Sequence, residues 1–193
     1  MSLSAPRSFL LWFNLALLLI LFFLRGQILS FLKPAEPLPV YGQLQPFILT
    51  DERGQPVTLE SLKENIWIMN FMFTRCPNQC PRMSFKMSAL QKVLPKNIHF
   101  VSVSVEPEHD TPTVLAEYAK RFKAERGRWI FLTGGKTESA AILKSAHLGD
   151  SGEPSMHSLR LILIDKNGSI RGYYNSEEEA PIENLRKDIQ KLL

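Results

Sequence analysis

Two cysteines, Cys76 and Cys80, are the residues of this sequence best suited to carry out chemistry. They are the only cysteines among the 193 residues, and three residues separate them. Side chains four positions apart on a helical turn face the same side, with roughly 5–6 Å between their Cβ atoms. The two sulfurs can therefore meet at one atom or bond to each other, which predicts a single chemical site.

A purely structural disulfide is the simplest use of this pair, but the sequence does not favour it. A five-residue loop would contribute about 2 kcal/mol, at the low end of what a disulfide yields. Small domains that depend on disulfides usually carry more cysteines, and a chain of this length can build a hydrophobic core. Redox chemistry or metal binding is the better interpretation.

The spacing of the cysteines leaves both of those possibilities open. Thioredoxin-type redox pairs have two residues between the cysteines, whereas Pro77, Asn78 and Gln79 lie between these. The wider spacing permits a disulfide and also leaves room for a metal between two thiolates. Soft thiolates favour Cu(I) and zinc, but structural zinc takes four protein ligands and the sequence has no second cysteine pair. Two thiolates and one imidazole would suit copper better.

Four histidines are candidates for the imidazole ligand. His99 lies within a predicted strand, His109 in a polar loop, and His147 near the end of a predicted helix, where ordinary structural roles suffice. His157 directly precedes a predicted strand, and in thioredoxin-like folds the loop that enters this strand faces the cysteines. It therefore ranks first.

The elements that must position the cysteines are a strand and a helix. Residues 66–73 are apolar on both faces apart from Asn70, which predicts a central strand buried on both sides. A helix is expected from about residue 83 to 94. Sites in open α/β sheets gather at the carboxyl ends of strands. A thiol near a helix N-terminus has a lowered pKa, and Arg75 and Arg82 should act in the same direction.

The rest of the sequence predicts a mixed sheet flanked by helices, in the element order of the thioredoxin fold. Strands are expected at 47–49, 56–57, 98–105 and 129–132, and a hairpin at 159–174. Helices are expected to begin at Thr58, Thr111, Thr137 and Pro181. Four methionines near the cysteines are expected to pack in the core: Met69, Met72, Met83 and Met87.

The N-terminal residues predict a membrane anchor. Residues 9–24 carry no charge and would form a helix of roughly 24 Å, slightly shorter than a bilayer core of about 30 Å. A cleaved signal peptide is the alternative, but Arg25, Gly26 and Gln27 follow where a small-residue cleavage site would be expected. We therefore expect an anchor with a transmembrane helix over 1–33, a proline-rich spacer over 34–46 and an exported domain over 47–193.

The charge of the chain excludes one class of partner. The formal net charge is +4, but acidic and basic residues nearly balance once the N-terminal segment is set aside. Nucleic-acid binding needs a clustered basic face, so no nucleic-acid partner is expected.

Two segments and one distant residue resemble the Sco/SenC family. Residues 71–81 resemble its signature, a CxxxCP motif after an apolar strand, and residues 105–112 resemble its DPExDTP stretch. His157 stands where that family places a third metal ligand, and the resemblance spans about residues 40–193. Glu106 occupies a position that is usually Asp, which keeps the charge and extends the side chain by one methylene.

This resemblance implies a copper chaperone that holds Cu(I) or Cu(II) through Cys76, Cys80 and His157. Its partner would be the copper-receiving subunit of cytochrome c oxidase or another copper protein. The domain would lie on the periplasmic side of a bacterial inner membrane, or in the mitochondrial intermembrane space.

Two other functions stay open. One is a thiol–disulfide oxidoreductase with Cys76 and Cys80 as its redox pair, and the other is a copper or redox sensor. A peroxidase is the weakest hypothesis, because Gln79 stands where a peroxidatic site usually has Thr or Ser.

Overall fold

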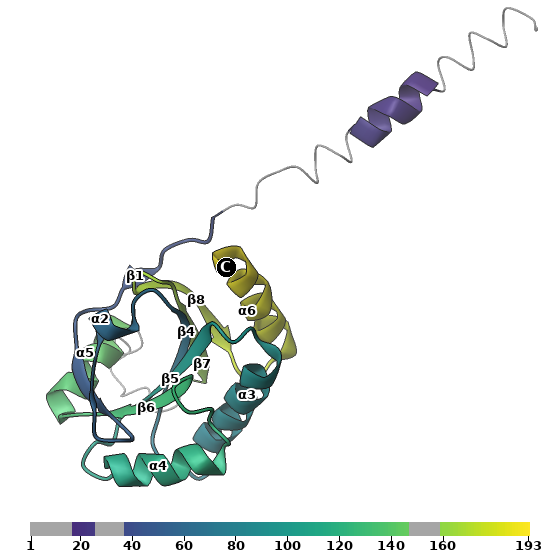
Figure 1. The fold of residues 1–193 in the computed structure, drawn as a ribbon. Helices are drawn as coiled ribbons and strands as arrows, with labels where there is room; N and C mark the ends of the chain where they lie inside the picture. The colour runs from purple at the N-terminus through teal and green to yellow at the C-terminus, as the bar shows by residue number, and fades with distance from the viewer. Residues whose placement is uncertain (1–16, 26–36, 147–158) are drawn as a thin grey trace, which may run out of the picture. The chain divides into compact units, whose positions relative to one another are not determined.

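The computed structural model describes residues 17–25, 37–146 and 159–193 (Figure 1). The chain forms two compact units, residues 1–37 and residues 38–193.

The first unit contains a helix over residues 17–25 whose large apolar side chains are exposed. Among the described residues, no helix has both the length and the apolar character that a membrane crossing requires. Residues 9–16 of the predicted anchor lie outside the described residues, so the anchor stays a prediction.

The second unit is built on one eight-stranded mixed sheet in the order β1-β8-β7-β4-β5-β6-β2-β3. Three central strands, β4, β5 and β6, run parallel, and each of the other strands is antiparallel to its neighbours. The strands are β1 Gly42–Gln43, β2 Ile48–Asp51, β3 Pro56–Thr58, β4 Ile66–Met72, β5 Ile98–Ser104, β6 Trp129–Thr133, β7 Arg160–Ile164 and β8 Ser169–Asn175.

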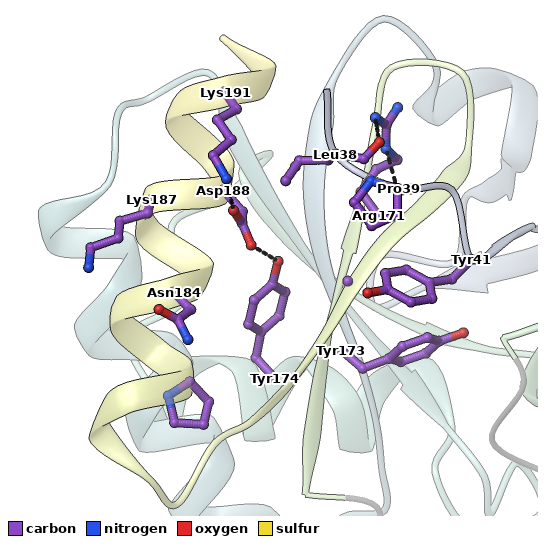
Figure 2. A pocket seen from close by; sticks show the side chains of 12 residues that line it. Leu38, Pro39, Tyr41, Arg171, Tyr173, Tyr174, Asn184, Lys187, Asp188 and Lys191 are labelled. Carbon is purple, nitrogen blue, oxygen red and sulfur yellow. Dashed lines mark hydrogen bonds and ion pairs between the residues drawn. The ribbon is translucent and has the colours of Figure 1, made fainter. Parts of the chain in front are cut away.

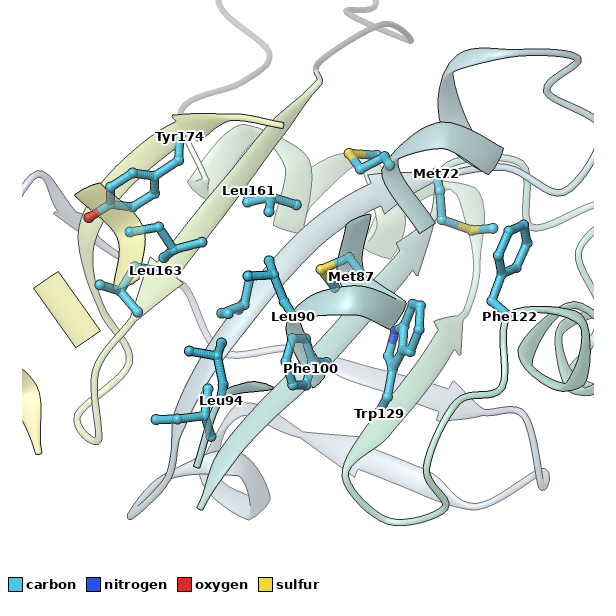
Figure 3. Close-up of a cluster of buried hydrophobic side chains, with 14 of the residues drawn as sticks. Met72, Met87, Leu90, Leu94, Phe100, Phe122, Trp129, Leu161, Leu163 and Tyr174 are labelled. Carbon is cyan, nitrogen blue, oxygen red and sulfur yellow. The ribbon is translucent and has the colours of Figure 1, made fainter. Parts of the chain in front are cut away.

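Helices cover both faces of this sheet. The helices are α2 Leu59–Leu62, α3 Gln79–Val93, α4 Pro112–Arg121, α5 Lys136–Ser145 and α6 Glu179–Leu192. Side chains of α3, α4 and α6 share one hydrophobic cluster with β4 and β5. Figure 3 shows part of this cluster, including Met87 and Leu90 of α3 and Phe100 of β5. Side chains of α2 and α5 belong to the cluster on the opposite face. The predicted mixed α/β, thioredoxin-like architecture is therefore confirmed.

The central strand β4 follows the pattern read from the sequence, since all seven of its residues are buried. Met69 belongs to one cluster, while Met72, Met83 and Met87 belong to the other, so the expectation that they pack in the core is confirmed.

A buried arginine fixes the C-terminal end of α3 to the sheet. The guanidinium of Arg128 donates to the carbonyl oxygens of Leu94 and Pro95, each at 2.9 Å, and to that of Gln91. It also donates to the carbonyl of Ile98, at the start of β5, at 3.0 Å. Carbonyl groups at a helix end lack partners within the helix, and Arg128 supplies donors for them.

The predicted spacer over 34–46 differs from the structure in its second half. From Leu38 onward these residues belong to the folded unit, and β1 pairs with β8. Leu38 and Leu44 are buried, and Arg171 donates to the carbonyl oxygens of Leu38 and Pro39. Apolar side chains between the prolines give this segment a place in the core, so the domain begins before residue 47.

Candidate metal centre

Cys76 and Cys80 lie where the chain passes from β4 into α3. The loop after β4 turns back on itself, with the N–H of Cys76 donating to the carbonyl of Phe73 at 3.3 Å. Asn78 is the N-cap residue of α3, but its side chain makes no capping hydrogen bond. The helix begins at Gln79, four residues before the predicted start, so Cys80 lies in its first turn.

The sulfur of Cys76 takes the role of a capping side chain. The N–H of Cys80 donates to Sγ of Cys76 at 3.2 Å. N–H groups in the first turn of a helix have no partner within the helix, and they stabilise a negative charge that lies close to the helix N-terminus. Both cysteines are free thiols and both are buried.

The two thiols differ in acidity. Burial raises the pKa of Cys76, but the N–H and thiol of Cys80, with the N–H groups of Asn78 and Gln79, lower it by more. The net pKa of Cys76 is below that of an ordinary thiol. Burial raises the pKa of Cys80 to about 12, and the neighbouring Cys76 and Asp110 act in the same direction. The predicted lowering of the pKa is therefore confirmed for Cys76 and wrong for Cys80.

Arg75 and Arg82 each pair with a carboxylate. Arg75 donates from Nε and Nη2 to one oxygen of Glu106, at 3.1 and 2.9 Å. Arg82 pairs with Glu177 at 2.8 Å. The Arg75–Glu106 pair links the cysteine loop to the segment that follows β5.

Asp110 makes a second link between the same two segments. It is fully buried, and its carboxylate accepts hydrogen bonds from the N–H of Thr74 at 3.1 Å and from the Thr74 hydroxyl at 2.5 Å. The hydroxyl of Ser104 donates to the same carboxylate at 2.5 Å. Sequence reasoning missed this role, because an Asp before a helix looks like an ordinary turn residue.

The structure places two of the four histidines. His99 lies within β5 and is partly buried; burial lowers its pKa, and so does the charge of Arg128. His109 is exposed in the turn before α4. His147 and His157 lie outside the described residues. Within the described ranges, no group of three His, Cys, Asp or Glu side chains could hold a metal ion.

A pocket of about 440 Å³ lies between β8 and α6 (Figure 2). The hydroxyl of Tyr174 donates to Asp188 at 2.9 Å, and Tyr41 packs edge-on against Tyr173. None of the residues that line this pocket belongs to the cysteine loop. Tyr173 and Tyr174 therefore have packing roles here.

Comparison with known proteins gives consistent matches. A family model described as SCO1/SenC matches residues 40–193. The SCO1 protein homolog of Bacillus subtilis (strain 168) is 31% identical over 161 residues, which are 79% of this chain and 83% of that protein.

Two solved structures share the fold. BsSco, described as a member of the Sco family of cytochrome c oxidase assembly proteins with a disulfide switch, has a TM-score of 0.71 at 27% identity. The match covers 81% of this chain and 98% of BsSco. Bradyrhizobium japonicum ScoI with copper bound has a TM-score of 0.62 at 26% identity, covering 76% of this chain and 99% of ScoI.

Proposed function

Because the chain belongs to the SCO1/SenC family, we propose that it binds copper and delivers it during assembly of a copper centre in cytochrome c oxidase. The observation that carries this proposal is the position of two free thiols on one turn, with the N–H of Cys80 on the sulfur of Cys76. In this proposal the protein carries the copper ion as cargo and catalyses no reaction.

The chemistry of the two sulfurs supports copper as the metal. Thiolates are soft ligands that favour Cu(I), and the burial of Cys76 and Cys80 keeps water and hard ions away from them. The related protein ScoI was solved with copper bound. Cys76 would ionise first, and binding of the metal would then draw the proton from Cys80, because a metal-bound thiol is deprotonated.

His157 is proposed as the third ligand. The strand β7 runs antiparallel to β4, with Ile162 opposite Met69, so β7 begins at the end of the sheet where β4 leads into the cysteine loop. Leu159, directly before β7, is held there by a hydrogen bond from the N–H of Ser176 at 2.8 Å. His157 is two residues before Leu159 in the chain.

Partner and location complete the proposal. BsSco is described as a cytochrome c oxidase assembly protein, and we infer that this chain acts on the copper-receiving subunit of that enzyme or on another copper protein. We further propose that residues 1–33 anchor the chain in a membrane and that the folded domain is exported.

A second function is favoured by the unequal acidity of the two thiols. In a thiol–disulfide oxidoreductase, the Cys76 thiolate would attack a substrate disulfide and release one substrate thiolate. Cys80, once deprotonated, would then attack the mixed disulfide at the Cys76 sulfur and release the second. The products are a reduced substrate and a Cys76–Cys80 disulfide. BsSco is described as having a disulfide switch, which makes this alternative worth testing.

The deciding experiment is copper binding to the full chain, purified in mild detergent and fully reduced. One equivalent of Cu(II) should give a sulfur-to-copper charge-transfer band, and metal analysis should find about one copper per chain. His157→Ala should lose the band, while the matched control His109→Ala, which alters an exposed histidine, should keep it. Absence of bound copper, together with rapid exchange with a disulfide substrate, would establish the oxidoreductase instead.

A further inference from the structure

Asp110 is a carboxylate with an unusual location: it is fully buried directly behind the cysteine loop. One of its oxygens accepts a hydrogen bond from the Thr74 hydroxyl. The other oxygen accepts hydrogen bonds from the Ser104 hydroxyl and, at 3.1 Å, from the Thr74 N–H. Thr74 is two residues before Cys76, and Ser104 ends β5. The carboxylate therefore ties the loop that carries Cys76 to the neighbouring central strand.

Every one of these donors is neutral. Within the described ranges, no Lys, Arg or His side chain forms an ion pair with Asp110; the nearby Arg75 pairs with Glu106. Hydrogen bonds from neutral groups stabilise a carboxylate without cancelling its charge. A fixed negative charge in a low-dielectric interior acts over several ångströms with little screening. Asp110 contributes to the rise in the pKa of Cys80, which is consistent with that charge reaching the Cys80 sulfur.

We propose that Asp110 is a positioning residue that holds the Cys76 loop through Thr74 and sets the redox preference of the cysteine site by its negative charge. The copper potential used to test this inference rests on the proposed function, because it requires that the cysteines bind copper. A copper ion held by two thiolates and a neutral imidazole carries no net charge as Cu(II) and one negative charge as Cu(I). A neighbouring carboxylate therefore disfavours Cu(I) relative to Cu(II).

The test is the Cu(II)/Cu(I) midpoint potential of the full chain and of its Asp110→Asn variant, measured by redox titration with mediators. Asn keeps the shape of Asp and one acceptor oxygen for Thr74, and its amide can donate to Ser104. The substitution removes the charge and also replaces the oxygen that accepts the Thr74 N–H at 3.1 Å with an amide nitrogen. Loss of the charge should raise the preference for Cu(I) about tenfold. For a one-electron couple this is a shift of about 59 mV to higher potential. A change below twofold would overturn the proposal.

Two further variants separate charge from structure. Asp51 is a second fully buried Asp, held by the N–H groups of Arg53 and Gln55 in the turn between β2 and β3 and by an ion pair with the Arg53 guanidinium at 2.6 Å. Asp51→Asn should lower stability and leave the copper potential unchanged. Ser104→Ala removes one donor and keeps the Asp110 charge, so the potential should stay or fall. A rise in either control would show that general loosening moves the potential, and the proposal would be wrong. If Asp110→Asn does not fold, Ser104→Ala is the remaining test: loss of a donor leaves the Asp110 charge less stabilised, so the potential should not rise, and a rise would overturn the proposal.

A copper-free measurement distinguishes failure of this inference from failure of the proposed function. The Cys76–Cys80 disulfide of the metal-free chain can be equilibrated with glutathione at fixed pH. Its reduced form gains negative charge when a thiolate is present, so Asp110→Asn should again favour reduction. If the full chain binds no copper but this shift is found, the chaperone function is wrong and the role of Asp110 stands. If copper binds and neither potential changes, the chaperone function stands and the proposed role of Asp110 is wrong.

Discussion

The N–H of Cys80 donates to the sulfur of Cys76 at 3.2 Å, so one reactive cysteine caps the helix that contains the other. Most helices use an oxygen of Ser, Thr, Asp or Asn for this contact, and the Asn78 side chain does not make it here. The same hydrogen bond contributes to the difference in acidity between the two thiols, and their reactivity should show that difference.

Cys76 should react with iodoacetamide well before Cys80 as pH is raised. The folded-state pKa of Cys76 is below the ordinary thiol value, whereas that of Cys80 is raised to about 12. Alkylation depends on the thiolate, so the two rates should rise in separate pH ranges. Peptide mass spectrometry of the reduced, metal-free chain measures both rates, and faster labelling of Cys80 would contradict the assignment.

The same shifts give opposite contributions to stability. Ionisation of Cys76, whose pKa is lower in the folded state, adds stability above its unfolded pKa, and this is lost as pH falls through the folded value. The raised pKa of Cys80 costs stability as pH rises above its unfolded value. Urea unfolding of Cys76→Ser and Cys80→Ser across pH 7 to 10 should therefore show pH slopes that differ in sign from one another.

Loss of His157 should weaken Cu(II) binding more than Cu(I) binding. Two thiolates suffice for linear Cu(I), whereas Cu(II) prefers a further nitrogen ligand. We expect His157→Ala to lose about a hundredfold or more in Cu(II) affinity and less than tenfold in Cu(I) affinity. Competition with chelators specific for each oxidation state measures both values, with His109→Ala as control. Equal losses in both states would remove His157 from the ligand set.

Arg128→Ala should destabilise the fold by about 3 kcal/mol, because it leaves buried carbonyl groups without donors. Arg128→Lys should recover part of this loss, since one ammonium cannot serve all of the carbonyls that the guanidinium reaches. Urea unfolding measures the difference in free energy. A loss below about 1 kcal/mol for the Ala variant would show that water replaces the arginine.

The Arg75–Glu106 pair should contribute less than about 1 kcal/mol to stability, because both side chains reach solvent. A double-mutant cycle with Arg75→Ala and Glu106→Gln isolates the coupling. Glu106→Asp restores the residue that the family usually has and shortens the side chain, so it should weaken the pair without unfolding the protein. A coupling of several kcal/mol would mark this pair as a structural requirement.

Two N-terminal truncations should behave differently. Removal of residues 1–33 should leave a folded, soluble domain that still binds copper, since the compact unit begins at Leu38. Removal of residues 1–46 also deletes β1 and the buried Leu38 and Leu44, at a cost of about 3–5 kcal/mol. Thermal unfolding of the two domains tests this. Equal stability would show that residues 34–46 act as a spacer, as the sequence predicts.

Local patterns predicted much of this fold, and the failures have physical causes. The apolar run of β4 and the helix starts at Thr58 and Thr111 are local signals, and the structure confirms them. The strand β1 is two residues long and exists through pairing with β8, more than 120 positions later. No local pattern carries such a contact. The start of α3 was misplaced because its cap is a sulfur, which no capping rule anticipates.

At the site, residue type and spacing sufficed for the cysteines and not for their surroundings. Cys76 and Cys80 are brought together as predicted, while His157 stays a prediction. The difference between the thiols comes from hydrogen bonds to the Cys76 sulfur and from burial. The hydrogen bonding and burial of the thiols cannot be predicted from the sequence of a turn, and neither can the burial of Asp110, because the same residue types also occur in exposed turns.

The hydrogen bonds of Arg128 fasten the C-terminal end of α3 to the sheet, whereas the N-terminal end of α3 contacts the sulfur of Cys76, the proposed copper ligand. If copper is loaded and released at this sulfur as proposed, we expect the first turn of α3 and the loop before it to absorb the change. The far end of α3 should report none of these events. On copper addition, spectroscopic labels on exposed Val93 should stay unchanged while labels near Asn78 respond, which would localise the effect of the metal to one end of α3 and leave the sheet undisturbed.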